Sequence, residues 1–113
     1  MSEIAIVGTG YVGLTAGACF AHLGHEVICY DINKEKIDEL SSGQIPIVEK
    51  GLETLVREGL EENRLSFTSV PEEAVSGCEV IFLCVPTPQR SDGTTDISIV
   101  DSAVRSIAQI LPQ

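Results

Sequence analysis

The sequence predicts an α/β fold, an open parallel sheet with helices on both faces, in one domain spanning residues 1–113. Three observations support this prediction. Short apolar runs alternate with longer segments of helical spacing, a glycine-rich turn follows the first run, and no internal repeat or flexible linker interrupts the pattern. Strands that alternate with helices pair in parallel through right-handed crossovers. At 113 residues the chain is long enough for one hydrophobic core.

Four short segments are expected to form the strands. Three are nearly continuous apolar runs, and the other alternates between apolar and polar residues. The expected strands are Ile4–Val7, Glu26–Asp31, Arg64–Ser69 and Glu79–Val85. A continuous apolar run such as the first is typical of a strand that is buried on both faces of a parallel sheet.

Five segments are expected to form helices: Tyr11–Leu23, Asn33–Gly43, Leu52–Asn63, Pro71–Gly77 and Asp96–Leu111. The first consists of small and apolar residues without proline, so we expect it to press closely on the sheet and to stop at Gly24. Asn33 and Asp96 are the expected N-caps, and Pro71 suits a first helical turn. The last helix is expected to carry its apolar residues on one face, namely Ile97, Val100, Val104, Ile107 and Leu111.

The composition argues against two classes of partner. The formal net charge is −10 and the isoelectric point is near 4.4, so the protein repels phosphate backbones and anionic lipid surfaces. The amino terminus lacks the features of a signal peptide, and no apolar run approaches the roughly 18 residues that span a bilayer. We therefore expect a soluble, cytoplasmic protein that binds neither nucleic acid nor membranes.

The four cysteines are expected to be buried, reduced thiols. Cys19, Cys29, Cys78 and Cys84 each lie within an apolar run, and their spacing matches neither a zinc ribbon nor a CxxC redox pair. Free cysteine usually behaves as a small buried hydrophobe. No metal site is predicted.

The stretch VGTGYVG, between the first strand and the first helix, carries the clearest functional signal. Gly8, Gly10 and Gly13 have the spacing GxGxxG inside a strand-helix-strand unit, which is the dinucleotide-binding fingerprint of a Rossmann-like, doubly wound sheet. Gly8 would permit a tight turn, Gly10 would let the backbone approach a pyrophosphate, and Gly13 would let the helix pack near the sheet. The helix N-terminus would then offer N–H groups and a partial positive charge to the phosphates.

An acidic residue at the end of the second strand completes this fingerprint. Asp31 follows the glycine loop by about 20 residues, as the fingerprint requires. A carboxylate there would accept hydrogen bonds from the ribose hydroxyls of the adenosine half and repel a 2′-phosphate, so NAD is the expected cofactor. NADP remains an alternative because Lys34 and Lys36 could reach a 2′-phosphate.

The segment VPTP leaves the fourth strand opposite the glycine loop. In such a sheet the ligand lies beyond the carboxyl ends of the first and fourth strands, where the strand order reverses. Pro86 cannot continue the strand ladder, and the two prolines would hold the backbone around Thr87 rigidly. Val85, Pro86 and Thr87 are therefore candidate cofactor contacts, although a stiff strand exit without a ligand role would look the same.

These motifs together resemble the UDP-glucose/GDP-mannose dehydrogenases, in particular their N-terminal NAD-binding domain. The resemblance rests on IAIVGTGYVGLTAG, YDINKEKIDELSSGQIPIVEKGL, VPTP and DGTTDIS, and it covers nearly the whole chain. It implies a two-fold oxidation of the C6 alcohol of a nucleotide sugar to a carboxylate, with two NAD reduced. We expect the full-length enzyme to bind a nucleotide-sugar substrate and to form a homo-oligomer.

The resemblance also implies particular cofactor contacts, which carry over to Val12, Asp31, Lys36 and Thr87. With those from the fingerprint, the complete set of expected NAD-binding residues is Gly8, Gly10, Tyr11, Val12, Gly13, Asp31, Lys36, Val85, Pro86 and Thr87. The family's catalytic cysteine, in a GGxCxPKD-like setting, has no counterpart in this sequence, so no catalytic residue is expected within it. We expect the chain to be the front part of a larger enzyme, truncated after the helix that follows the fourth strand.

Two other functions are compatible with the same residues. The chain could be a stand-alone NAD-binding module with a regulatory or redox-sensing role, or a fragment that keeps the fold without useful affinity. The sequence does not identify which nucleotide sugar is the substrate.

Overall fold

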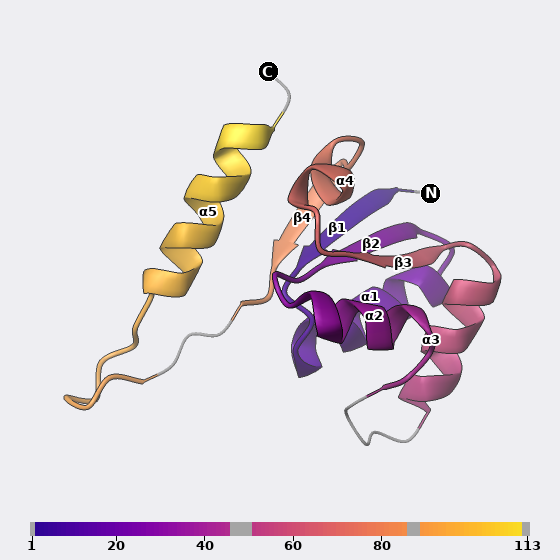
Figure 1. Cartoon of the computed structure of the whole chain (residues 1–113), viewed down its shortest axis with the longest axis horizontal. Coiled ribbons are helices and arrows are strands. Elements are labelled where there is room, and N and C mark those ends of the chain that lie inside the picture. Colours follow the sequence, from indigo (N-terminus) through magenta and orange to yellow (C-terminus); the bar gives the residue numbers. More distant parts are fainter. Residues whose placement is uncertain (1, 46–50, 86–88, 112–113) are drawn as a thin grey trace.

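The computed structural model describes residues 2–45, 51–85 and 89–111. Within them four parallel strands form one sheet in the order β3-β2-β1-β4 (Figure 1). The strands are β1 (Glu3–Val7), β2 (Glu26–Tyr30), β3 (Leu65–Thr68) and β4 (Val80–Leu83). The predicted α/β class is confirmed, and the strand order reverses between β1 and β4, as expected for a doubly wound sheet.

In the described ranges, five helices connect and follow the strands. They are α1 (Tyr11–His22), α2 (Lys34–Ser41), α3 (Leu52–Glu61), α4 (Pro71–Val75) and α5 (Ser98–Ile110). Asn33 is the N-cap of α2, as predicted, and its side-chain oxygen accepts a 3.1 Å hydrogen bond from the N–H of Lys36. Pro71 occupies the first turn of α4, where its missing N–H costs no helical hydrogen bond.

Alternate residues of β1 face two separate parts of the core. Ile4 and Ile6 join a cluster with side chains from α1, α2 and α3, whereas Ala5 and Val7 pack with side chains from α4 and α5. Successive side chains of a strand point to opposite faces, so both faces of the central strand are covered. This arrangement explains why the first strand reads as an uninterrupted apolar run.

The first helix packs closely on the sheet. Its buried residues are Gly13, Leu14, Gly17, Ala18 and Ala21. At Gly17 a Cβ atom would stand 2.8 Å from the Sγ of Cys29 on β2, closer than real Cβ atoms approach. The small residues of α1 therefore serve close packing, as the sequence predicts.

One prediction about α5 is wrong, and most of its apolar face is not buried. The N-cap is Ile97 rather than Asp96, although the Asp96 carboxylate accepts a 2.9 Å hydrogen bond from the N–H of Ser98 just inside the helix. Within the expected apolar face only Ile107 is buried, where it meets Ala74 and Val75 of α4, while Ile97 is 60% exposed. Helical periodicity identified an apolar stripe, but it could not determine which side of the helix would contact α4.

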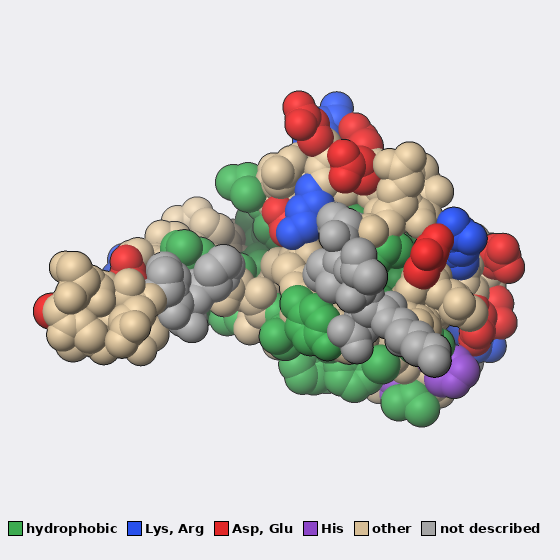
Figure 2. Space-filling view, turned by 90° about the horizontal axis from the view of Figure 1, so that it is seen from below, with side chains coloured by type: hydrophobic (Ala, Val, Ile, Leu, Met, Phe, Trp, Pro, Cys, Tyr) green, Lys and Arg blue, Asp and Glu red, His purple; other side chains and the backbone are tan. Residues whose placement is uncertain are grey.

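The prediction of buried thiols holds only in part. Cys29 is fully buried, Cys78 and Cys84 are partly buried, and Cys19 is exposed on α1. The described residues contain no group of side chains that could hold a metal ion, and none of their helices is long and apolar enough to cross a membrane. On the face drawn in Figure 2, Asp and Glu lie in small groups with Lys and Arg among them, rather than in one acidic block.

Candidate dinucleotide-binding site

The turn between β1 and α1 requires glycine at its first position. Gly8 has a φ of +104°, in the left-handed region that residues with a Cβ rarely adopt. A Cβ here would lie 2.6 Å from the carbonyl oxygen of Cys84, directly after β4. The Gly8 N–H donates a 2.8 Å hydrogen bond to the carbonyl oxygen of Tyr30 at the end of β2. The predicted tight turn is confirmed, and it joins the carboxyl ends of three strands.

The second glycine leaves the start of α1 open. Gly10 is the N-cap, so no side chain of this residue occupies the N–H groups of the first turn, and that turn contains no acidic residue. Among the residues that the structure describes, a Cβ added to Gly10 would meet no atom within 4 Å. The neighbouring Tyr11 and Val12 are exposed. This end of α1 thus combines space with the partial positive charge of a helix N-terminus.

The third glycine serves packing within the loop. A Cβ on Gly13 would collide with the carbonyl oxygen of Gly8 and lie 3.2 Å from the Cβ of Cys84. Gly13 therefore allows α1 to approach the turn and the end of β4. This agrees with the expected packing role and adds the particular atoms that require it.

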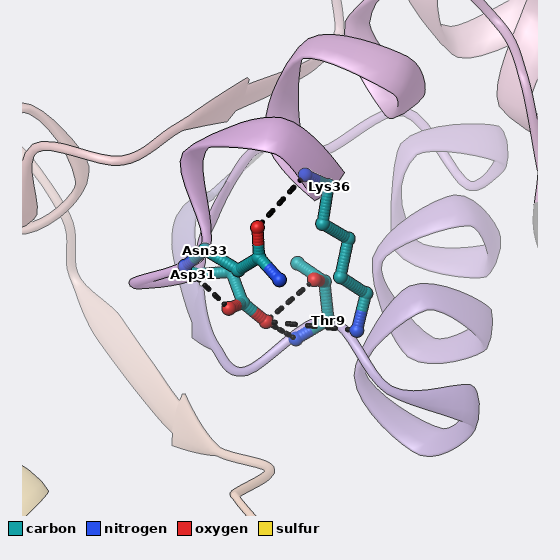
Figure 3. A network of polar contacts seen from close by, with 4 residues as sticks. All are labelled: Thr9, Asp31, Asn33 and Lys36. Carbon is teal, nitrogen blue, oxygen red and sulfur yellow. Dashed lines mark hydrogen bonds and ion pairs between the residues drawn. The ribbon is translucent and has the colours of Figure 1, made fainter.

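Asp31, directly after β2, is the centre of a polar network (Figure 3). Its Oδ2 atom accepts hydrogen bonds from the N–H of Thr9 at 3.0 Å and from the Thr9 hydroxyl at 2.7 Å. Its Oδ1 atom accepts the N–H of Asn33 at 3.0 Å, and the Nζ of Lys36 lies 3.7 Å from Oδ2. The network ties the glycine loop, the end of β2 and the start of α2 together.

This network keeps the Asp31 carboxylate ionised. Partial burial alone would raise its pKa, but the hydrogen bonds from Asn33 and Thr9, together with the charge of Lys36, outweigh burial and hold the pKa below the ordinary value. The Asp31 side chain is 17% exposed, so a ligand can reach it. At neutral pH the site therefore offers a negatively charged hydrogen-bond acceptor.

A cavity of about 300 Å³ adjoins Asp31 at the carboxyl ends of β1 and β2. Its walls are mostly apolar and include Gly8, Ile32 and Val85, with Ala103 of α5 on the opposite side. Most small-molecule sites combine apolar walls with a few placed polar groups, as this cavity does with Asp31. Gly8, Asp31 and Val85, three of the predicted contacts, thus line one cavity.

A hollow of about 360 Å³ at the amino ends of the strands is chemically different. Its lining includes Glu3, Glu26 and Glu73, with Arg64 as the basic residue. Three carboxylates would repel a pyrophosphate. The chemistry of the two hollows therefore agrees with the general rule that ligands of open α/β sheets bind at the carboxyl ends of the strands.

The structure brings most of the predicted residues to one end of the sheet. Lys36 lies there through its ion pair with Asp31, whereas Pro86 and Thr87 lie outside the described residues. Sequence reasoning missed the side chain of Thr9, which is not among the expected NAD-binding residues. A hydroxyl-bearing residue between the first two glycines was the available signal.

The fold and the site define a dinucleotide-binding protein of the Rossmann type. The glycine loop open at α1, the ionised acid after β2 and the adjoining apolar cavity fit the phosphates, ribose and base of such a ligand. Residues 2–113 match the UDP-glucose/GDP-mannose dehydrogenase family, NAD binding domain. The chain belongs to this family, and NAD is the cofactor of the domain.

Individual relatives agree with this assignment. The chain is 41% identical over 111 residues to UDP-glucose 6-dehydrogenase TuaD of Bacillus subtilis, covering 98% of this chain and 24% of the relative. It is 47% identical over 107 residues to UDP-glucose 6-dehydrogenase of Rhizobium meliloti, covering 94% and 24%. The crystal structure of a ternary complex of GDP-mannose dehydrogenase from Pseudomonas aeruginosa matches with a TM-score of 0.92 and 40% identity, covering 96% and 25%. The chain thus spans about a quarter of the length of these relatives.

Proposed function

We propose that this chain is the NAD-binding part of a nucleotide-sugar 6-dehydrogenase, which oxidises the C6 alcohol of a UDP- or GDP-sugar to a carboxylate. The observation that carries the proposal is the ionised Asp31 carboxylate beside a glycine loop that leaves the start of α1 open. The names of the relatives, which are UDP-glucose and GDP-mannose dehydrogenases, support the substrate class. NAD supplies the hydride acceptor for such an oxidation.

The residues of this chain would bind and orient the cofactor. The backbone from Gly10 to Gly13 would hold the pyrophosphate, because no side chain of Gly10 blocks the helix N-terminus. Asp31 would accept a hydrogen bond from the adenosine ribose, and the apolar cavity beside it would receive the adenine base. Val85, Pro86 and Thr87 would contact the cofactor from the end of β4.

The same site favours NAD over NADP. A 2′-phosphate would approach the Asp31 carboxylate and be repelled by it. Lys36 offers little compensation, because its ammonium group lies 3.7 Å from that same carboxylate and is already paired with it. Of the two lysines that could reach a 2′-phosphate, Lys36 is therefore already engaged within the protein.

Isothermal titration calorimetry with NAD and NADP tests the cofactor part of this proposal. We expect binding of NAD and markedly weaker binding of NADP. Tighter binding of NADP would overturn the cofactor preference. The substrate part is tested by giving UDP-glucose or GDP-mannose and NAD to the protein encoded by the complete gene and following NADH absorbance. No NADH with either sugar nucleotide would contradict the activity that we propose.

A further inference from the structure

We propose that Thr9 is a positioning residue that holds the Asp31 carboxylate in place for the cofactor and presents its Oδ1 atom to the ribose. This inference rests on the proposed function, since it concerns the same NAD site. It assigns a role to a side chain that would not itself touch the ligand.

The first step is the geometry of the contact. Thr9 donates twice to one oxygen, through its backbone N–H at 3.0 Å and its hydroxyl at 2.7 Å. The short hydroxyl distance is typical of a hydrogen bond to a charged acceptor, which is stronger than one between neutral groups. Thr9 follows β1 and Asp31 follows β2, so this hydrogen bond links the carboxyl ends of two neighbouring strands (Figure 3).

The second step is a count of acceptor positions on the carboxylate. Each oxygen has two lone pairs. Both positions of Oδ2 are taken by Thr9, with Lys36 also nearby, whereas Oδ1 accepts only the N–H of Asn33 among the described residues. One position therefore remains, and it belongs to Oδ1. A ribose hydroxyl would be the donor that completes it.

The third step is the burial of Thr9, which has no exposed surface. A ligand cannot reach the side of Oδ2 that faces the Thr9 hydroxyl. If this hydroxyl is removed, one lone pair of Oδ2 has no hydrogen-bond donor inside the protein. A rotation of the carboxylate that brings this oxygen to water then becomes more favourable. The orientation offered to the ribose is then lost, although Asp31 itself is still present.

Binding of NAD to a set of variants tests this role. Thr9→Val keeps the shape and the backbone N–H but removes the hydroxyl, and Thr9→Ser keeps the hydroxyl. We expect Thr9→Val to weaken NAD binding about tenfold and Thr9→Ser to stay within about twofold of the wild type. Circular dichroism shows whether each variant is folded. Should Thr9→Val fail to fold, Thr9→Ala removes the hydroxyl together with the γ-methyl group and places no new atom in the site.

A double-mutant cycle separates positioning from a general effect on structure. Because Thr9 acts through Asp31, Thr9→Val should change NAD affinity by less than about twofold in the background of Asp31→Ala. We also expect Thr9→Val to reduce the preference for NAD over NADP, because a displaced carboxylate repels a 2′-phosphate less effectively.

The possible failures are distinguishable. If the wild type binds NAD and Asp31→Ala weakens that binding but folded Thr9→Val does not, the role of Thr9 is overturned while the proposed function stands. An equal loss from Thr9→Val with and without Asp31 would also overturn the positioning role. If the wild type binds neither NAD nor ADP-ribose, the proposed function fails, and this inference fails with it.

Discussion

A single carboxylate, Asp31, determines much of the chemistry of the candidate site. Its negative charge is stabilised by Thr9, Asn33 and Lys36, which come from the glycine loop and from the start of α2. A charged acceptor held in this way can bind a ribose hydroxyl more strongly than a neutral one. Both predictions at the scale of the residue therefore concern Asp31.

The substitution Asp31→Ala should weaken NAD binding by about 1 to 3 kcal/mol, because charge-assisted hydrogen bonds are lost. Calorimetry measures the change. The matched control is Glu35→Ala, which removes one carboxylate from the exposed first turn of α2 without touching the network. Equal affinities of the wild type and Asp31→Ala would remove Asp31 from the site.

The lowered pKa of Asp31 also predicts a pH dependence of stability. The folded pKa lies below the unfolded value, which is about 3.9, so the ionised carboxylate stabilises the fold above that value. This contribution should be lost as the pH falls below about 3.9 and through the folded pKa. Denaturant unfolding of the wild type and Asp31→Asn at several acidic pH values measures it, and their difference isolates Asp31 from the other acids.

The prediction would be contradicted if the difference in the free energy of unfolding between wild type and Asp31→Asn stayed constant from neutral to strongly acidic pH. A difference that increases as the pH falls would show that the ionised carboxylate destabilises the fold, which is the opposite of the prediction.

At the scale of the element, α1 uses glycine for two unrelated purposes. At its start, Gly10 leaves space where a Cβ would meet no atom of the described part of the chain. Along its body, Gly17 lets the helix approach Cys29 on β2 so closely that a Cβ would be 2.8 Å from the sulfur. One glycine belongs to the site and the other to the fold.

Gly10→Ala should impair NAD binding with little change in stability, because its methyl group occupies the space proposed for the pyrophosphate. Surface changes of this kind usually alter the free energy of unfolding by less than about 0.5 kcal/mol. Denaturant unfolding and calorimetry on the same variant test both halves. Full NAD affinity in Gly10→Ala would show that the phosphates do not lie against this residue.

Gly17→Ala should have the opposite profile and destabilise the fold. Overpacking costs about 1 to 3 kcal/mol, which exceeds the gain of up to about 1 kcal/mol from replacing glycine in a helix. Adding Cys29→Ala removes the sulfur from the contact and should restore part of the lost free energy of unfolding. If Gly17→Ala is as stable as the wild type, the close approach of α1 and β2 is not a constraint.

At the scale of the whole molecule, the edge formed by β4 is a surface open to association with another chain. Among the described residues, β4 pairs only with β1. Val80 and Leu83 are 43% and 40% exposed, and Phe82 is partly covered by its stacking on Phe20 at 5.2 Å. An exposed apolar strand with an unpaired edge is a template for pairing with another chain.

We therefore expect the 113-residue chain to self-associate as its concentration rises, and Val80→Lys to reduce this association. A charge on an edge strand opposes pairing with a second edge. Sedimentation equilibrium measures the change. Ser66→Lys, on the opposite edge strand β3, is the matched control and should leave association through β4 intact. A wild type that remains monomeric at high concentration would contradict the prediction.

Much of the fold was predictable because its signals are local. A tight turn needs glycine at Gly8, a short polar side chain at Asn33 caps the next helix, and apolar runs mark the strands. Each of these features depends on backbone conformation within a few residues. The sequence alone therefore determined the order of strands and helices along the chain and the position of the glycine loop.

Only the tertiary structure decided how distant residues meet. The hydroxyl of Thr9 finds Asp31 across 22 positions of the chain, and α5 buries Ile107 while leaving Ile97 exposed. Cys19 faces solvent although its sequence neighbours are apolar. Periodicity and residue type indicate whether a side chain favours a buried or an exposed position. Its actual partners and exposure depend on how the whole chain packs, which no local stretch of sequence encodes.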